Sequence, residues 1–318
     1  MKVLVTGGAG FIGSTLVDRL LAEGHSVDVI DNLTTGSLSN LADARSNPSY
    51  QLSFYNLDVR SVELVELMAR LRPEVVYHLA AQVDVRVSVA RPVLDADINV
   101  LGTLRVLEGA REAGSPRVVF TASGGTLYGE PDSSLLPIKE SFPWQPLSPY
   151  GVSKLAGMEY LALYKKMYGI DYCALALSNV YGPRQDANGE AGVVAIFAGC
   201  LASGIPATIY GDGTQTRDFI YVDDVVDALV RGANEGGGMV INIGSGQETS
   251  INRLYEILAD ASGCKLPPVY APPRPGEVMH NCLDPSLAHE VLGWKPWTSL
   301  EEGVRAVVQH YAAMQRNR

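Results

Sequence analysis

Residues 1–31 read MKVLVTGGAGFIGSTLVDRLLAEGHSVDVID, and this stretch decides the fold. A short apolar run, Lys2 to Thr6, is followed by glycines at positions 7, 8, 10 and 13. The next apolar residues fall four apart, on one face of a helix: Ile12, Leu16 and Leu20. A second apolar strand then ends at Asp31, eighteen residues after Gly13. This order of strand, glycine turn, helix, strand and acid predicts a dinucleotide-binding corner.

Each part of this corner has a physical reason. Glycine allows backbone angles that other residues avoid, and it lets the main chain approach a pyrophosphate closely. The anion then meets free N–H groups and the positive end of the helix dipole. Asp31 can accept hydrogen bonds from both hydroxyls of the adenosine ribose, whereas it would repel the extra phosphate of NADP. No arginine follows in residues 32–34, so the predicted cofactor is NAD.

Composition excludes several classes of function. The chain has 318 residues and a net charge of -10, so we expect neither nucleic acid nor an anionic membrane surface as a partner. The four cysteines and five histidines form no metal-binding pattern, and no metal site is predicted. The first strand begins at residue 2, and the longest apolar stretch, residues 193–205, is short and contains glycine. We therefore expect no signal peptide, no membrane span and a cytoplasmic location.

Strands and helices alternate as far as residue 177. The pattern predicts an α/β fold with a doubly wound parallel sheet of the Rossmann type, covered by helices on both faces. Ligands then bind where the carboxyl ends of the strands meet. Beyond residue 178 the elements are shorter, which predicts a smaller, mixed α/β lobe for the substrate. The expected units are thus residues 1–177 for the cofactor and 178–318 for the substrate, with some later segments returning to the first sheet.

Several local expectations follow from the same pattern. Residues 32–47 are predicted to form a loop, and residues 267–275 a proline-rich connector. A helix from Ser61 is expected to turn Val62, Val65 and Met68 inward. Long helices are predicted over residues 92–113 and 148–167. The second is apolar nearly all round, more than one buried face requires, and therefore predicts a subunit interface.

Tyr150 and Lys154 lie four residues apart at the start of that helix, hence on one face. A tyrosine has a pKa near ~10, and an adjacent lysine and a cationic nicotinamide both stabilise its phenolate and bring the pKa towards ~7. The pair therefore predicts a catalytic base. Surface packing of the two side chains is the alternative.

The sequence resembles the extended short-chain dehydrogenase/reductases that act on nucleotide sugars, and within them the UDP-glucose (UDP-galactose) 4-epimerase family. The resemblance covers nearly the whole chain. Its motifs are the glycine pattern 7-10-13, Asp58-Val59, His78 to Ala81, Asn99, Tyr150 with Lys154, Asn179 to Arg184, Gly192 to Phe197, Gly211 to Asp218 and Arg274 to Glu277.

This resemblance implies a tightly bound NAD and a UDP-sugar substrate. It also implies a homodimer packed through the helices at about 92–113 and 149–167. The residues implied for NAD are Gly7, Gly10, Phe11, Ile12, Gly13, Asp31, Asn32, Asp58, Val59, Leu79, Ala80, Ala81, Gln82, Asn99, Tyr150 and Lys154.

Substrate residues are implied in both lobes. Arg217 and Arg274 would grip the diphosphate, since arginine matches phosphate in a bidentate fork. An ion pair with Asp218 is the alternative for Arg217. The whole implied set is Arg86, Ser123, Thr126, Tyr150, Asn179, Val193, Tyr210, Arg217, Arg274 and Glu277.

One position departs from the family. The catalytic serine or threonine usually precedes the tyrosine of the Tyr-Gly pair by four residues, and here that position is Gly124. The neighbouring hydroxyls are Ser123 and Thr126. We expect Ser123, with Tyr150 and Lys154, to be catalytic, and Thr126 to contact substrate or to take its place.

The predicted activity is 4-epimerisation of a UDP-hexose through a 4-keto intermediate. A 4,6-dehydratase is disfavoured because Gly124-Gly125-Thr126 contains no acid, and a UDP-uronate epimerase because Gln185-Asp186 follows Arg184 where a basic residue is expected. A silent NAD sensor would need neither Tyr150 nor Lys154. Asn281-Cys282, at the implied gate beside the sugar, leaves both the C2 hydroxyl and the N-acetyl forms open.

Overall fold

The computed structural model describes residues 1–187, 192–264, 266–274 and 278–316. Within them, seven parallel strands form one sheet in the order β11-β6-β5-β4-β1-β2-β3. The order reverses between β1 and β4, where Thr6 pairs with Ile30 on one side and with His78 on the other. The doubly wound parallel sheet is thereby confirmed, with its switch point at the glycine corner.

The inner strands of this sheet are largely apolar because both of its faces are covered, whereas the edge strand β3 has no buried residue. All six residues of β6 are buried. In chain order the strands are β1 (Lys2–Thr6), β2 (Ser26–Asp31), β3 (Gln51–Asn56), β4 (Val75–His78), β5 (Arg117–Ser123), β6 (Tyr172–Leu177) and β11 (Met239–Ile243).

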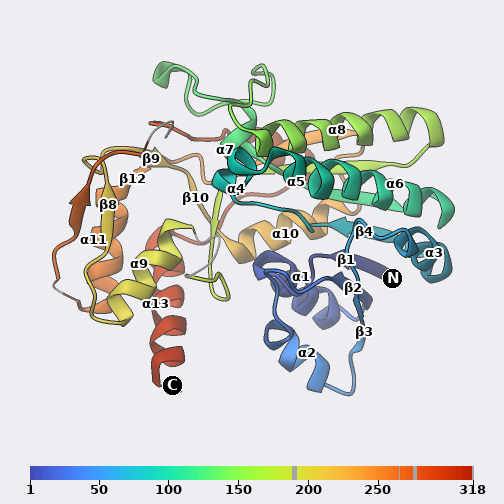
Figure 1. Cartoon of the computed structure of the whole chain (residues 1–318), viewed down its shortest axis with the longest axis horizontal. Helices are drawn as coiled ribbons and strands as arrows, with labels where there is room; N and C mark the ends of the chain where they lie inside the picture. Colours follow the sequence, from blue (N-terminus) through green and yellow to red (C-terminus); the bar gives the residue numbers. More distant parts are fainter. Residues whose placement is uncertain (188–191, 265, 275–277, 317–318) are drawn as a thin grey trace.

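Helices cover the sheet on both sides (Figure 1). One face carries α1 (Phe11–Ala22), α10 (Val222–Gly232) and α12 (Ser286–Leu292). The other carries α3 (Glu63–Leu71), α6 (Gly102–Glu112) and α8 (Pro149–Tyr168). The shorter helical segments of this part are η1 (Leu38–Leu41), α2 (Ala42–Ser46), α4 (Val85–Ala90), α5 (Pro92–Ala96), η2 (Asp97–Leu101), α7 (Gly124–Leu127) and η3 (Ser133–Leu135).

A second lobe lies at one end of the sheet, around a hydrophobic core of its own (Figure 1). Its helices are α9 (Val193–Ala202), α11 (Ile251–Ser262) and α13 (Leu300–Arg316). Its short strands pair two by two, β7 (Asn179–Tyr181) with β10 (Phe219–Tyr221), β9 (Thr216–Arg217) with β12 (Thr249–Ser250), and β8 (Thr208–Tyr210) with β13 (Val269–Ala271). Because β11 pairs with β6, the chain crosses between the lobe and the large sheet more than once. A division at residue 177 stays a prediction.

Some local predictions were wrong. Of the residues predicted to face inward on α3, Met68 is buried, Val65 is half-buried and Val62 is exposed. The rest of the buried face is a stripe of leucines spaced three and four apart: Leu64, Leu67 and Leu71. Residues 32–47 include the short helices η1 and α2, and the proline-rich connector includes β13. The helix expected over 92–113 contains a π-helical turn, η2.

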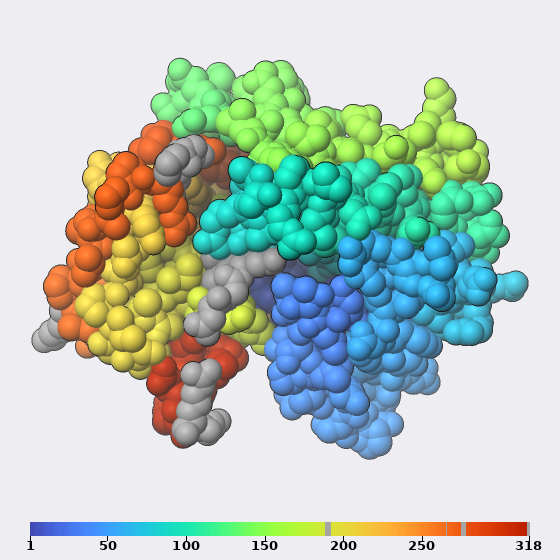
Figure 2. All heavy atoms as spheres, in the orientation of Figure 1, coloured from blue at the N-terminus to red at the C-terminus, as the bar shows by residue number. Residues whose placement is uncertain are grey.

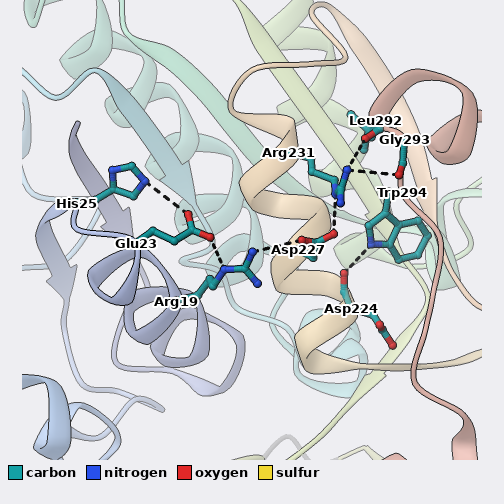
Figure 3. A network of polar contacts seen from close by, with 9 residues as sticks. All are labelled: Arg19, Glu23, His25, Asp224, Asp227, Arg231, Leu292, Gly293 and Trp294. Carbon is teal, nitrogen blue, oxygen red and sulfur yellow. Dashed lines mark hydrogen bonds and ion pairs between the residues drawn. The ribbon is translucent and has the colours of Figure 1, made fainter.

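A polar network fastens α1 to α10 (Figure 3). Arg19 of α1 pairs with Glu23, and its Nη2 lies 3.5 Å from Asp227 Oδ1 of α10. Arg231 Nε donates to the other oxygen of Asp227 at 2.6 Å and also binds the carbonyl of Leu292. Trp294 Nε1 donates to the carbonyl of Asp224 at 2.8 Å. The network thus joins α1, α10 and residues 292–294 through the carboxylate of Asp227 and the buried indole of Trp294.

None of the described helices combines the length and the apolar composition that a membrane span requires.

We predict that Asp227→Asn lowers the free energy of unfolding by about 1 kcal/mol, because its largely buried carboxylate joins two helices. Glu23→Gln, which alters only the exposed end of the network, should cost less than about 0.5 kcal/mol. Urea unfolding of both variants measures the difference. Equal losses would show that the link between α1 and α10 contributes nothing.

Candidate active site

The glycine corner lies at the end of β1, where the backbone packs too closely for side chains. Gly7 has φ of 72°, and a Cβ at Gly13 would lie 2.1 Å from the carbonyl oxygen of Gly7. The first turn of α1 follows, and the N–H groups of such a turn have no partner within the helix. The corner therefore presents free donors and a positive dipole end to an anion.

Two carboxylates stand at the neighbouring strand ends. Asp31 accepts the N–H of Ala9 at 2.9 Å on Oδ2 and that of Leu33 at 2.8 Å on Oδ1. These bonds fix the carboxylate and leave lone pairs for ribose hydroxyls. Asp58 accepts from Asn32 and from the guanidinium of Arg60, whose hydrogen bonds hold the pKa of Asp58 well below its ordinary value. Asp58 is therefore ionised at neutral pH.

A cleft of about 840 Å³ opens above these strand ends. On the face drawn in Figure 2, a hollow separates the N-terminal residues, in blue, from residues of the second lobe, in yellow and red. The cleft gathers nearly all the residues implied for NAD. Those that line it are Gly7, Gly10, Phe11, Ile12, Gly13, Asp31, Asn32, Asp58, Val59, Leu79, Ala80, Ala81, Gln82, Tyr150 and Lys154.

Asn99, the remaining residue of that set, lies behind the lining. It sits in η2 and is buried. Its Oδ1 accepts the N–H of Gln82 at 2.8 Å, and its Nδ2 donates to the carbonyl of Gln82 at 2.9 Å. Asn99 thus holds the backbone of a lining residue by two hydrogen bonds.

Tyr150 and Lys154 come from the first turns of α8. Ser148 caps this helix by accepting the N–H of Gly151 at 3.2 Å, and Pro149 occupies its first turn. Both side chains line the cleft although little of either is exposed. The ammonium of Lys154 lies 5.9 Å from the centre of the Tyr150 ring.

The surroundings of Lys154 change the pKa of its ammonium group. Its Nζ donates to the carbonyl of Thr121 in β5 at 3.0 Å and lies 5.0 Å from the centre of the Phe120 ring. Burial lowers the pKa of Lys154 to about 8, and the negative charge of Asp95 opposes this shift. The group is therefore mostly protonated at neutral pH and loses its charge in mildly alkaline solution.

The hydroxyls at the end of β5 have different surroundings. Ser123 lines the cleft beside Tyr150. Thr126 turns its Oγ1 towards the carbonyl of Ser123 at 3.3 Å, a bond within the local turn. A Cβ at Gly124 would lie 2.4 Å from Leu283 Cδ1 and 3.2 Å from the carbonyl oxygen of Ala176, so the family's usual hydroxyl residue would require the Leu283 side chain to shift. This packing is consistent with the departure at Gly124.

None of the described substrate residues implied in the second lobe is among those that line the cleft, although Asn179 lies between Ser178 and Val180, which are. Arg274 stacks on Tyr210, with its guanidinium carbon 3.9 Å from the ring centre. Arg217 Nη1 donates to the carbonyl of Thr216, and Asn179 is tied by its N–H to the carbonyl of Asp218.

The other implied substrate residues are more scattered. Val193 begins α9. Arg86 of α4 pairs with Asp84, the N-cap of that helix, and does not itself line the cleft, although Val83 and Val87 do. Glu277 is outside the described residues.

Sequence reasoning missed some residues of the site. Arg184 and Gln185 also line the cleft. Asp95 is buried against Asn99 and Gln82. Its position four residues before Asn99, one helical turn away, is the signal that could have found it.

Comparisons with known proteins cover nearly the whole chain and agree on one family. The sequence model of the NAD dependent epimerase/dehydratase family matches residues 3–244. The UDP-glucose 4-epimerase of Mycolicibacterium smegmatis is 48% identical over 312 residues, which cover 98% of each chain. The crystal structure of a UDP-glucose 4-epimerase from Thermotoga maritima with UDP-glucose superposes with a TM-score of 0.93 at 42% identity, covering 99% of this chain and 100% of that one. The UDP-glucose 4-epimerase of Thermus thermophilus in complex with NAD gives a TM-score of 0.89 at 41% identity, covering 98% and 99%.

We predict that Gly13→Ala abolishes retention of NAD and destabilises the fold by roughly 2 kcal/mol or more, because the new methyl group collides with the Gly7 carbonyl. The measurements are the NAD released from the purified protein by denaturation and the urea unfolding curve. Gly125→Ala, where a Cβ meets nothing within 4 Å, is the control for stability. Normal NAD content in Gly13→Ala would contradict the assignment of the corner.

Proposed function

The chain belongs to the NAD dependent epimerase/dehydratase family, and from this premise we infer that it is a UDP-hexose 4-epimerase that interconverts UDP-glucose and UDP-galactose with NAD. The observation that carries the inference is the pairing of Tyr150 and Lys154 in the wall of a cleft built on a dinucleotide corner. The match over the whole chain to a UDP-glucose 4-epimerase supports the same activity.

The residues of the corner fit NAD. The packed turn at Gly7 and Gly13 leaves the N–H groups of α1 facing the cleft, and Asp31 is held by backbone donors with lone pairs left for a ribose. When bound, NAD supplies a hydride acceptor that also returns the hydride. We propose that the residues implied for it hold it within residues 1–177.

The chemistry of the chain's own residues is proton transfer. Tyr150 as phenolate takes the proton of the sugar 4-hydroxyl while C4 loses its hydride, and a 4-keto sugar forms. The ammonium of Lys154 stabilises the phenolate, and Ser123 donates a hydrogen bond to the oxygen at C4. After the sugar turns its other face towards the site, Tyr150 returns the proton and C4 regains the hydride with inverted configuration. Protons and electrons therefore balance over one cycle.

The second lobe would hold the UDP part. Arg217 and Arg274 supply positive charge for the diphosphate in a chain of net charge -10. Tyr210 lies against Arg274 and offers a flat surface for the uracil ring. We propose Asn179, Val193, Thr126 and Arg86 as further substrate contacts, and Glu277 as the partner of the uridine ribose.

Other activities of the family have weaker support in these residues. A 4,6-dehydratase needs an acid beside the catalytic hydroxyl, and Gly124-Gly125-Thr126 offers none. A UDP-uronate epimerase needs a cation for the carboxylate, and Gln185-Asp186 follows Arg184. A non-catalytic sensor would have no use for a lysine buried beside a tyrosine.

The test is incubation of the purified protein, without added cofactor, with UDP-glucose, UDP-N-acetylglucosamine and UDP-glucuronate, followed by proton NMR of the products. We expect UDP-galactose from UDP-glucose. Tyr150→Phe should lower kcat by about 100-fold or more, since it removes the base, and should leave NAD bound. A 6-deoxy-4-keto product, or an active Tyr150→Phe, would contradict the proposal.

We also propose that the protein is a homodimer that works in the cytoplasm. Exposed apolar side chains gather on α5, η2 and α8, which pack against one another: Val93, Leu101, Val152 and Leu163. A second copy of this surface would bury them in a bundle in which α5, η2 and α8 pack against their counterparts. All four cysteines are free, which favours a reducing compartment.

Leu101→Glu and Leu163→Glu should each shift the protein from dimer to monomer, because a carboxylate in the centre of the bundle would be buried without a partner. Sedimentation velocity measures the state. Val269→Glu, at an equally exposed valine of β13, is the control and should leave the dimer intact. A monomeric wild type would contradict the interface.

A further inference from the structure

A buried carboxylate lies behind the site, at Asp95 in the last turn of α5. The residue is 1% exposed. Its Oδ1 accepts from Gln82 Nε2 at 2.8 Å and from Asn99 Nδ2 at 3.1 Å. Its Oδ2 is buried with no hydrogen-bond partner among the described residues. Burying a carboxylate of which only one oxygen accepts hydrogen bonds costs free energy. A positive charge nearby offsets part of this cost.

Asn99 connects this carboxylate to the helix of the catalytic pair. Its Nδ2 lies 3.2 Å from Ser153 Oγ, which in turn donates to the carbonyl of Tyr150 at 2.9 Å. The π-helical turn η2 brings Asn99 to this point, and both α5 and η2 pack against α8. Asp95 thus holds together Gln82 at the cleft wall, η2 and the first turns of α8.

His78 faces the same site from β4 but carries no charge. Thr103 Oγ1 donates to the carbonyl of Asn99 at 2.6 Å, so it accepts from His78 Nε2 at 3.0 Å. His78 Nδ1 then accepts from Thr6 Oγ1 at 2.7 Å. Both ring nitrogens are satisfied in the neutral form, and burial lowers the pKa of His78 to about 3.

Each group around Lys154 acts on its ammonium in a different way. The carbonyl of Thr121 is its hydrogen-bond acceptor, and the rings of Phe120 and Tyr150 flank it. His78 is neutral. Asp95 supplies the negative charge that opposes the effect of burial on this ammonium.

We propose that Asp95 is a positioning residue for the reaction, whose buried carboxylate fixes Asn99 and Gln82 against α8 and keeps the ammonium of Lys154 charged at the pH of catalysis. The proposal rests on the proposed function for its kinetic consequence, but the charge on Lys154 can be measured without turnover.

The test is Asp95→Asn, which keeps an acceptor oxygen for Gln82 and Asn99 and removes the charge. Lysine labelled with ¹³C at Cε reports the protonation of Lys154 in the NAD-loaded protein, and Lys154→Met assigns the signal. We expect the midpoint to be lower by about half a unit in Asp95→Asn than in the wild type, because a nearby negative charge favours the protonated amine. Asp95→Glu, which keeps the charge, should restore the higher midpoint.

Kinetics give the second readout. The alkaline limb of the kcat profile should shift to lower pH by the same amount as the NMR midpoint, while KM for UDP-glucose stays within about twofold. Asp224→Asn is the matched control: it removes a buried carboxylate from α10, which contacts Trp297 and Thr298, and should leave both midpoints unchanged. Asp95→Ser makes the same test if Asp95→Asn does not fold.

A Lys154 midpoint in the neutral Asp95 variants equal to that of the wild type overturns the proposal. A wild type that does not epimerise UDP-glucose would instead contradict the proposed function, and the NMR titration would still decide the role of Asp95.

Discussion

A positive charge buried at Lys154 is the constraint on which the arrangement of the site depends. An ammonium group withdrawn from water must find an acceptor, and here that acceptor is the main-chain carbonyl of Thr121 near the end of β5. This bond sets how the first turns of α8 lie against the sheet, so it also sets where Tyr150 stands. The strand end, the helix and the phenol are therefore placed by one interaction, which a surface lysine could not provide.

A second buried charge attaches the substrate lobe. Asp218, between β9 and β10, is fully buried, and its carboxylate accepts the N–H groups of Ser245, Gly246 and Leu283. Ser245 and Gly246 follow β11, so the carboxylate ties the lobe to the edge of the large sheet. The Asp227 network, by contrast, ties α1 to α10 on one face of the large sheet. The Asp218 contacts thus join the two lobes by directional polar bonds.

The sequence predicted the sheet and the corner well, because strand, glycine turn and helix are local patterns with fixed spacing. It failed where the outcome depends on distant partners. On α3 the prediction of Met68 was right, but Val62 lies before the first helical residue and is exposed, and the leucines at 64, 67 and 71 form the rest of the buried face. The π-helical turn η2 has no composition signal of its own. Asp95 looked like an ordinary helix residue, and only the packing of α5 on α8 makes it part of the site. The stacking of Arg274 on Tyr210 likewise joins two residues 64 positions apart in the sequence.

The indirect placement of Asp95 has a physical advantage. Among the described residues no carboxylate lies within 4.0 Å of the Lys154 ammonium, whose direct acceptor is a neutral carbonyl. A carboxylate in contact would neutralise the ammonium and cancel its effect on the phenol of Tyr150. A carboxylate held further away, by Gln82 and Asn99, still favours the charged amine. The ammonium can then still stabilise the phenolate of Tyr150. The reaction requires Tyr150 to take up a proton and later to return it, so its phenol must be ionised yet easily protonated. A direct ion pair at Lys154 would favour neither proton transfer.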